Sequence, residues 1–124
     1  MTLTTWVVVR HRFDALHHWP NAPVHRAYLG QDHRHLFHVE MRIQVFDDDR
    51  ALEFHDILKK LQREWCVPGT RADGMNDIGA MSCEMVAKSI LSAARREYDK
   101  RAMKVSVFED GENGAIVEWQ HEAE

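Results

Sequence analysis

The pattern of apolar and polar residues marks four segments of the chain as strands. The clearest alternation covers residues 35–46, where apolar side chains occupy every second position and polar side chains the positions between them. That period of two is typical of a strand with one buried face. β-Branched and aromatic residues predict a strand at residues 6–15, and alternation predicts another at 103–107. A fourth strand is expected at residues 115–119, after a turn cluster.

Two helices are expected between the second and third strands. Apolar residues recur at helical spacing over residues 54–65. The second helix begins after Ser82, a favoured N-cap residue, and its apolar face covers residues 83–98. Prolines and glycines mark residues 19–32 as a long loop and residues 68–80 as an irregular segment.

The order of these elements is β-β-α-α-β-β, and a turn cluster at residues 110–114 joins the last two strands as a hairpin. Strands at both ends of the chain that flank two helices predict an α+β fold. We expect an antiparallel four-stranded sheet with two helices on one face. The 124 residues, 1–124, form a single domain. Domains of this size are often stabilised further by oligomerisation.

The charge and the cysteines narrow the range of partners. The formal net charge of -4 does not favour a nucleic-acid partner, because such proteins usually carry a basic stripe. Cys66 and Cys83 form no C-x-x-C pair, which favours a reduced, intracellular setting. The apolar run at residues 6–9 is too short for a signal peptide or a membrane span. We therefore expect a cytoplasmic protein with no membrane partner.

Nine histidines raise the question of a metal site. His33 and His35 are two residues apart at the start of a predicted strand, so their side chains share one face, and it is the face of the buried apolar residues. Two such histidines can approach one tetrahedral ion from the same side, and His17 or His18 on the preceding strand offers a third. Three histidines leave one zinc position open, as in catalytic sites.

A single H-x-H pair is a weak signal, because a chain rich in histidine can contain one by chance. A metal-free structural protein with incidental histidines is therefore an alternative. The remaining histidines are expected at the surface or in loops, the commoner place for this residue type, and they are His11, His25, His38, His55 and His121.

Several motifs follow one another in an order that resembles a known enzyme family. F-D-A-L-H at residues 13–17 and a proline-bearing loop precede H-R-H at residues 33–35 and an alternating strand. Further matches lie at E-F (53–54), S-C-E (82–84) and V-S-V-F-E (105–109). In this order and spacing, over residues 6–119, the chain resembles the 6-pyruvoyltetrahydropterin and 6-carboxytetrahydropterin synthases.

The resemblance implies a T-fold subunit that binds zinc through His17, His33 and His35. His17 is preferred to His18 because of its place in the first motif. The resemblance also implies that Glu109 anchors a pterin ring, since a carboxylate can accept two parallel hydrogen bonds from the aminopyrimidine edge. Alternatively, Glu109 ends its strand and meets solvent in the turn.

Two other acidic residues belong to matching motifs. Glu84 either stabilises the first turn of the second helix through the helix dipole or lines the pocket, as the matching family residue does. Glu53 is expected to be structural at the start of the first helix.

The chain departs from the family where the family's proton-transfer residues lie. The family has a cysteine four residues before its H-x-H motif, and Leu29 occupies that position here. It also has an Asp-His pair between its helices, whereas residues 67–71 read V-P-G-T-R. Cys83 at a helix N-terminus is one candidate replacement, because that setting lowers a thiol pKa, although a buried apolar role is the alternative. The other candidates lie in the long loop, and they are His25, Tyr28 and Asp32; Cys66 is expected to be inert.

Two functional hypotheses follow. The first is an enzyme, a zinc-dependent carbon-oxygen lyase that eliminates triphosphate from a dihydroneopterin triphosphate-type pterin. The second is a catalytically silent module or scaffold of the same fold that binds a pterin or purine-like ligand. The resemblance also implies a homo-oligomer, a trimer or hexamer, and leaves both tetrahydrobiopterin and queuosine biosynthesis open as the pathway.

Overall fold

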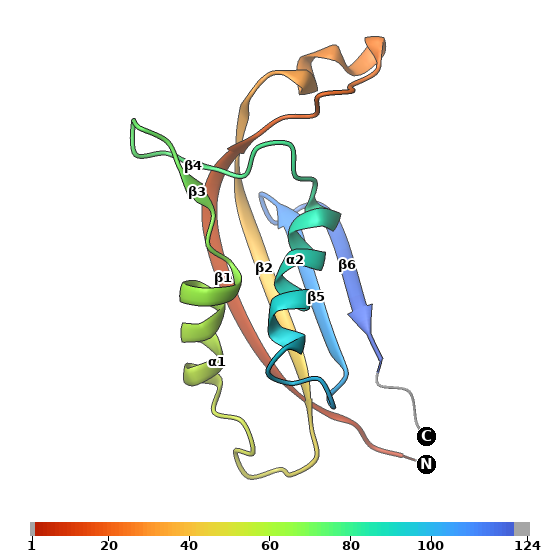
Figure 1. Ribbon diagram of the computed structural model, residues 1–124. Coiled ribbons are helices and arrows are strands. Elements are labelled where there is room, and N and C mark those ends of the chain that lie inside the picture. Colours follow the sequence, from red (N-terminus) through yellow and green to blue (C-terminus); the bar gives the residue numbers. More distant parts are fainter. Residues whose placement is uncertain (1, 121–124) are drawn as a thin grey trace.

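The computed structural model describes residues 2–120 and has the expected α+β architecture. Its strands are β1 Thr5–His17, β2 His33–Val45, β3 Gly69–Thr70, β4 Asn76–Asp77, β5 Met103–Glu109 and β6 Asn113–Trp119. Its helices are η1 Val24–Gly30, α1 Phe54–Lys60, η2 Leu61–Trp65 and α2 Cys83–Arg95. The strands form one sheet in the order β3-β4-β1-β2-β5-β6, and α1 and α2 cover one face of it (Figure 1).

Strands β1 and β2 form a long antiparallel hairpin of 13 residues each. The register pairs Thr5 with Val45 at one end and His17 with His33 at the other. Apolar residues have the same parity in both strands, so they line one face of the hairpin and are buried there. A slip of one residue would turn this whole set towards solvent, so burial fixes the register that brings the histidines together.

The sheet has six strands, so the expectation of four is wrong. The two additional strands, β3 and β4, lie in the segment 68–80, and each has only two residues. β4 runs parallel to the end of β1, where the Ile78 N–H donates to the Leu16 carbonyl at 2.9 Å. A two-residue strand is too short to show alternation, and it forms here because the neighbouring edge of β1 is open to pairing. No local pattern could therefore reveal it.

Both predicted helices are present, and capping residues fix their starts. The predicted helix over residues 54–65 comprises α1 and η2, because α1 passes directly into a π-helical turn. Glu53 accepts a hydrogen bond from the His55 N–H at 3.2 Å, which confirms its structural role. Ser82 Oγ accepts from the Met85 N–H at 3.2 Å, as expected of the N-cap of α2.

The segment 19–32 forms an arm beyond the end of the β1–β2 hairpin (Figure 1). It contains η1, a 3-10 helix kinked at Arg26, where the sequence predicts only a loop. None of the seven residues of η1 is buried. The base of the arm is closed by the Trp19 N–H, which donates to the Leu29 carbonyl at 2.7 Å. This bond places both side chains next to the histidine-bearing ends of the strands.

The core lies between the sheet and the helices. α2 packs against β5 and β6, and α1 packs against β1. Burial of each large apolar side chain contributes roughly 1.5–3 kcal/mol, and the largest fully buried ones include Phe37, Met41, Ile43, Ile57, Leu61, Ile90 and Met103.

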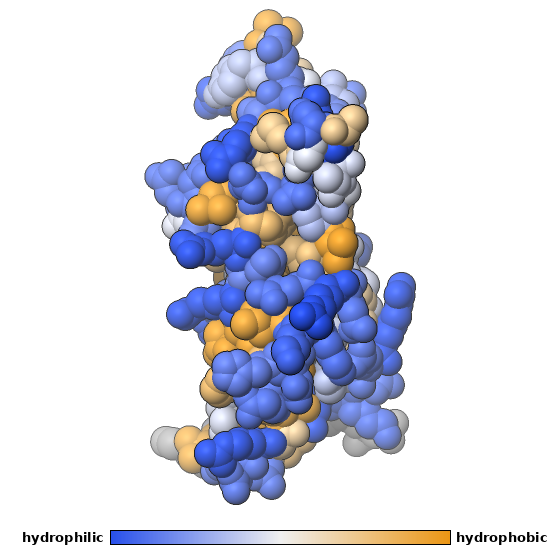
Figure 2. Space-filling model, turned by 90° about the vertical axis from the view of Figure 1, so that its left-hand side faces the viewer, coloured by the Kyte–Doolittle hydropathy of each residue, from blue (hydrophilic) through white to orange (hydrophobic). Residues whose placement is uncertain are grey.

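Polar side chains cover much of the rest of the molecule. The side that carries α1 and the β3–β4 hairpin shows mainly hydrophilic side chains, with separate apolar patches between them (Figure 2). On the sheet face away from the helices, Glu40 pairs with Arg10 at 3.0 Å and with Arg42 at 2.8 Å. None of the helices within residues 2–120 is long and apolar enough to cross a membrane.

Candidate metal centre and adjoining pocket

Three histidines converge at the end of the β1–β2 hairpin. His17 ends β1 opposite His33, and His35 lies one pleat further along β2. The ring centroids are 4.5 Å apart for His17 and His33, and 5.1 Å apart for His33 and His35. One ligand nitrogen from each of the three lies within 4.8 Å of the other two, so they could hold one metal ion.

Backbone carbonyls fix the proton positions of two of these rings. His17 Nδ1 lies 2.9 Å from the carbonyl oxygen of Met81, and His33 Nδ1 lies 2.9 Å from that of Gln31. A carbonyl oxygen can only accept a hydrogen bond, so both Nδ1 atoms donate. When such a ring is neutral, its Nε2 carries a lone pair that is available to an ion.

The third ring lies between two carboxylates. His35 Nδ1 is 2.7 Å from Asp110 Oδ2, and His35 Nε2 is 3.2 Å from Glu109 Oε2. Glu109 Oε1 is also 3.6 Å from His17 Nε2. A neutral imidazole whose Nδ1 donates presents a lone pair to the Glu109 carboxylate, and either a proton on Nε2 or a bound metal ion would remove the repulsion between them.

His17 provides the clearest test of whether a metal fits. Burial, together with the nearby His33 and His35 rings, lowers its pKa and outweighs the opposite effects of the Met81 carbonyl and of Glu109. The ring is therefore neutral, and its buried Nε2 has no hydrogen-bond partner among residues 2–120. An unpaired buried polar atom costs about 1–3 kcal/mol, which a bound metal ion would remove. Imidazole nitrogens suit zinc and other divalent transition ions.

His18 does not belong to this cluster. β1 ends at His17, and the His18 ring turns towards the arm, where its Nδ1 lies 3.2 Å from Asp32 Oδ1. This contact is not a hydrogen bond, and the Nδ1 atom has no hydrogen-bond partner within the described part of the chain. Of the two alternatives in the sequence, His17 is the residue that completes the three-histidine cluster.

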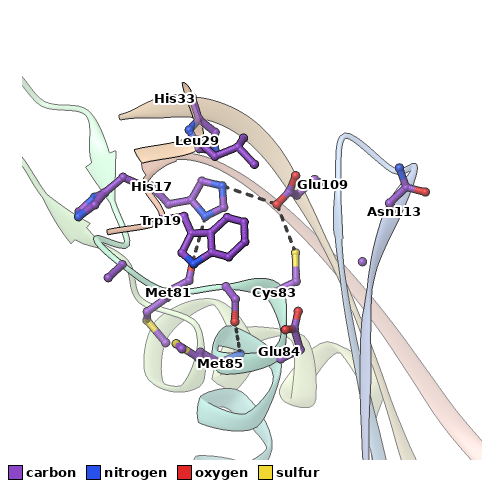
Figure 3. Close-up of a pocket in the computed structure, with 14 residues that line it drawn as sticks. His17, Trp19, Leu29, His33, Met81, Cys83, Glu84, Met85, Glu109 and Asn113 are labelled. Carbon is purple, nitrogen blue, oxygen red and sulfur yellow. Dashed lines mark hydrogen bonds and ion pairs between the residues drawn. The ribbon is translucent and has the colours of Figure 1, made fainter. Parts of the chain in front are cut away.

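A pocket of about 510 Å³ opens beside the histidines (Figure 3). His17 and His33 form part of its wall, and Glu109 points into it from the end of β5. The remaining walls come from the arm, the N-terminus of α2 and the start of β6. They include Trp19, Leu29, Met81, Ser82, Cys83, Glu84, Asn113 and Gly114.

Glu109 connects the metal cluster with the pocket. It pairs with Phe37 across the β2–β5 ladder and is the last residue of β5 on the side that faces the core. Its side chain is 34% exposed, which leaves the carboxylate accessible from the pocket. The Cys83 thiol donates a weak hydrogen bond to Glu109 Oε1 at 3.8 Å. The Glu109 carboxylate therefore faces the histidines and the pocket.

Of the two alternatives for Cys83, an activated thiol at a helix N-terminus and a buried apolar side chain, the structure favours the buried one, because Cys83 is 6% exposed. Burial, followed by the negative charges of Glu109 and Glu84, raises the pKa of Cys83 to about 12. Burial disfavours the charged thiolate and the two carboxylates repel it, so the thiol keeps its proton at neutral pH. Burial also raises the pKa of Cys66 to about 12, in keeping with its expected inertness.

The other candidates for proton transfer lie apart from the pocket. His25 and Tyr28 are exposed on η1, and Asp32 approaches His18 and Arg71, the latter at 3.6 Å. None of these three candidates lines the pocket, whereas Leu29 does. Glu84 lines the pocket and also lies in the first turn of α2, so the two interpretations of this residue are compatible.

The sequence did not indicate several residues of the site. Trp19 and Asn113 line the pocket, and Asp110 holds His35. Met81 lines the pocket and holds His17 through its carbonyl, and the Gln31 carbonyl holds His33. Trp19 and Asn113 lie in or next to loops whose shape no periodicity predicts. For Asp110 the sequence offered one signal, its position directly after Glu109. The same cluster of residues is also typical of an ordinary turn, so this signal was weak.

The fold and the site define an α+β protein with a candidate three-histidine metal centre beside a carboxylate-bearing pocket. Compared with known proteins, the chain matches no family model and no curated sequence.

Proposed function

We propose that the protein is a zinc-dependent pterin synthase-like lyase with a T-fold, which acts on a dihydroneopterin triphosphate-type pterin. One observation carries the proposal: three imidazoles converge on one point, and the Glu109 carboxylate shares their pocket. Imidazoles of this number suit zinc with an open position. A carboxylate nearby suits the aminopyrimidine edge of a pterin.

The pocket suits a flat heterocycle. Its volume of about 510 Å³ falls within the range typical of small-molecule sites. Glu109 would accept two hydrogen bonds from the aminopyrimidine edge, and Trp19 and Leu29 would provide apolar walls. The pterin side chain would then point towards His17 and His33.

The chain's own residues would bind and orient the substrate. His17, His33 and His35 would hold zinc, which when bound polarises hydroxyl groups of the substrate. Elimination of triphosphate breaks a carbon–oxygen bond and requires loss of a proton from the substrate. The Cys83 thiol is a poor acceptor for that proton because its pKa is raised to about 12.

A second candidate function is a catalytically silent module that binds a pterin or purine-like ligand. Leu29 favours it, since this residue lines the pocket where the family has its thiol. The protonated Cys83 favours it as well. Silent binding needs only the metal cluster and Glu109.

One experiment separates these functions. The purified protein is analysed for metal, incubated with 7,8-dihydroneopterin triphosphate and examined by mass spectrometry. The lyase should contain about one zinc per chain and should consume the substrate with release of triphosphate. Tight pterin binding without turnover, lost in Glu109→Gln and retained in Glu112→Gln, would establish the silent module. A protein that contains no zinc and binds no pterin would exclude both functions.

We also propose that the protein forms a homo-oligomer, a trimer or a hexamer. β6 is an edge strand, and along residues 5–15 β1 has no strand partner on its outer side within residues 2–120. Open edges of this length invite pairing with another chain. A pterin substrate and free cysteines suit a cytoplasmic setting.

A further inference from the structure

Asp110 makes a set of contacts that the proposed function does not use. It follows Glu109 in the turn between β5 and β6. Its Oδ2 lies 2.7 Å from His35 Nδ1, and its Oδ1 accepts from the Leu36 N–H at 2.9 Å. The Asp110 N–H donates in turn to the Leu36 carbonyl at 2.7 Å. Both carboxylate oxygens are therefore engaged by the start of β2.

The backbone of Asp110 is held in an unusual conformation. Its φ of 56° lies in the left-handed region, which residues other than glycine rarely adopt. Aspartate tolerates this region better than most residues do. Such a conformation persists where the surrounding contacts fix it, and here the contacts are those with His35 and Leu36.

Asp110 differs from the groups that hold the other two histidines. His17 and His33 donate to neutral backbone carbonyls, whereas His35 donates to a charged side chain. A carboxylate on Nδ1 fixes the tautomer and the ring orientation and raises the basicity of Nε2. Of the three acceptors, it is the one that an amino-acid substitution can remove.

We propose that Asp110 is a positioning residue of the metal centre: it holds His35 with Nδ1 protonated, so that Nε2 faces the ion. This inference rests on the proposed metal centre. It assigns to the β5–β6 turn a role in metal affinity, in addition to the role of Glu109 in the pocket.

Asp110→Asn tests the proposal with little change of shape. An asparagine has one oxygen in place of two, so it cannot accept from both His35 Nδ1 and the Leu36 N–H. An amide NH₂ that faces His35 would favour the tautomer with the proton on Nε2, and this nitrogen would then have no lone pair for the ion. Asparagine also tolerates positive φ.

Zinc affinity, measured by competition with a chromophoric chelator, is the first readout. Asp110→Asn should weaken zinc binding by roughly 10–100-fold. Glu112→Gln is the matched control, because it removes the same charge from an exposed position in the same turn. The control should stay within about twofold of the wild type, since solvent screens an exposed charge.

The second readout is the tautomer of His35 in the metal-free protein, measured by long-range ¹H–¹⁵N correlation at alkaline pH, where an imidazole ring is neutral. The wild type should show the proton on Nδ1, and Asp110→Asn should shift it towards Nε2. Asp110→Gly is a second variant that separates the loss of the contacts from backbone strain. Glycine adopts positive φ without strain, and it removes both carboxylate oxygens that accept hydrogen bonds. It should weaken zinc binding as Asp110→Asn does.

The outcomes separate this inference from the proposed function. If the wild type binds zinc and both Asp110 variants bind it equally well, Asp110 does not position His35 and the proposed function stands. If Asp110→Asn and Glu112→Gln lose affinity equally, loss of charge alone explains the effect and the inference is wrong. If the wild type binds no zinc, the metal centre and this inference are both wrong.

Discussion

At the scale of single residues, the site depends on where the histidine rings carry their protons. Three acceptors hold the Nδ1 atoms: the Met81 carbonyl before α2, the Gln31 carbonyl in the arm and the Asp110 carboxylate in the β5–β6 turn. Each comes from a different part of the fold. The Nε2 atoms therefore point to one place only when these parts are assembled, so metal binding and folding should be coupled.

The two cysteines yield a prediction about reactivity and pH. Burial raises the pKa of both Cys66 and Cys83 to about 12, so the folded protein favours the protonated thiol. At pH 8 roughly one thiol in ten thousand is ionised at such a pKa. We expect iodoacetamide to label the native protein very slowly at pH 8 and faster as the pH rises towards 12. The urea-unfolded protein should react as ordinary thiols do.

A single-cysteine variant makes this test specific to the pocket. In a Cys66→Ser background only Cys83 can be labelled, and its rate in the native state reports the thiolate in the pocket. Rapid labelling of Cys83 at pH 8 would contradict the raised pKa and would restore this residue as a candidate base.

At the scale of elements, the β5–β6 hairpin is packed too closely for a side chain at one position. A Cβ atom at Gly114 would lie 1.9 Å from the Val107 carbonyl oxygen and 2.6 Å from the Phe108 Cα. These are backbone atoms of the paired strand, so they cannot move aside without disturbing the ladder. The same hairpin carries Glu109 and Asp110, and its geometry therefore supports both the pocket and the metal centre.

We expect Gly114→Ala to reduce the free energy of unfolding by about 1–3 kcal/mol, because the added methyl group overpacks the hairpin. Urea denaturation measures the change. Gly30→Ala is the control, since its Cβ would meet the Trp19 carbonyl oxygen at 3.5 Å, an ordinary contact. That variant should lie within about 0.5 kcal/mol of the wild type. Equal stability of the two variants would show that the hairpin relaxes around the methyl group.

At the scale of the whole molecule, a metal ion would join β1 to β2 where the hairpin ends and the arm begins. We expect zinc at 100 times its dissociation constant to stabilise the protein by about 2.7 kcal/mol, because the ion binds the folded chain alone. Thermal unfolding with zinc and with a chelator measures this difference. His33→Ala should abolish the response to zinc while the metal-free protein still unfolds cooperatively. An identical Tm with and without zinc in the wild type would contradict the metal centre.

The open edges of β1 and β6 predict self-association. We expect light scattering to give a mass that is a multiple of the 14.5 kDa chain. Ile116 in β6 is 63% exposed, so Ile116→Lys should place a charge in the edge contact and shift the protein towards the monomer. A wild type that is monomeric at high concentration would contradict this prediction.

Much of the fold and part of the site could be predicted from neighbouring residues in the chain. β-Branched and aromatic residues identified β1, and alternation identified β2 and placed His33 and His35 on one face. The N-cap Ser82 marked the start of α2 correctly. Such signals are local, because strand parity and helix capping depend on residues a few positions apart.

What the sequence determined by itself was the four long strands, the two helices, the α+β class and the pair of histidines on β2. The resemblance pointed to His17 as the third histidine, and the tertiary structure showed that its ring reaches the other two. The tertiary structure alone decided that β3 and β4 extend the sheet and that burial beside Glu109 raises the pKa of Cys83. The reason is distance along the chain. Met81 lies 64 residues from His17, and Asp110 lies 75 residues from His35. Hydrogen-bond acceptors and buried charges act through space, so only the folded chain brings them to the residues whose chemistry they set.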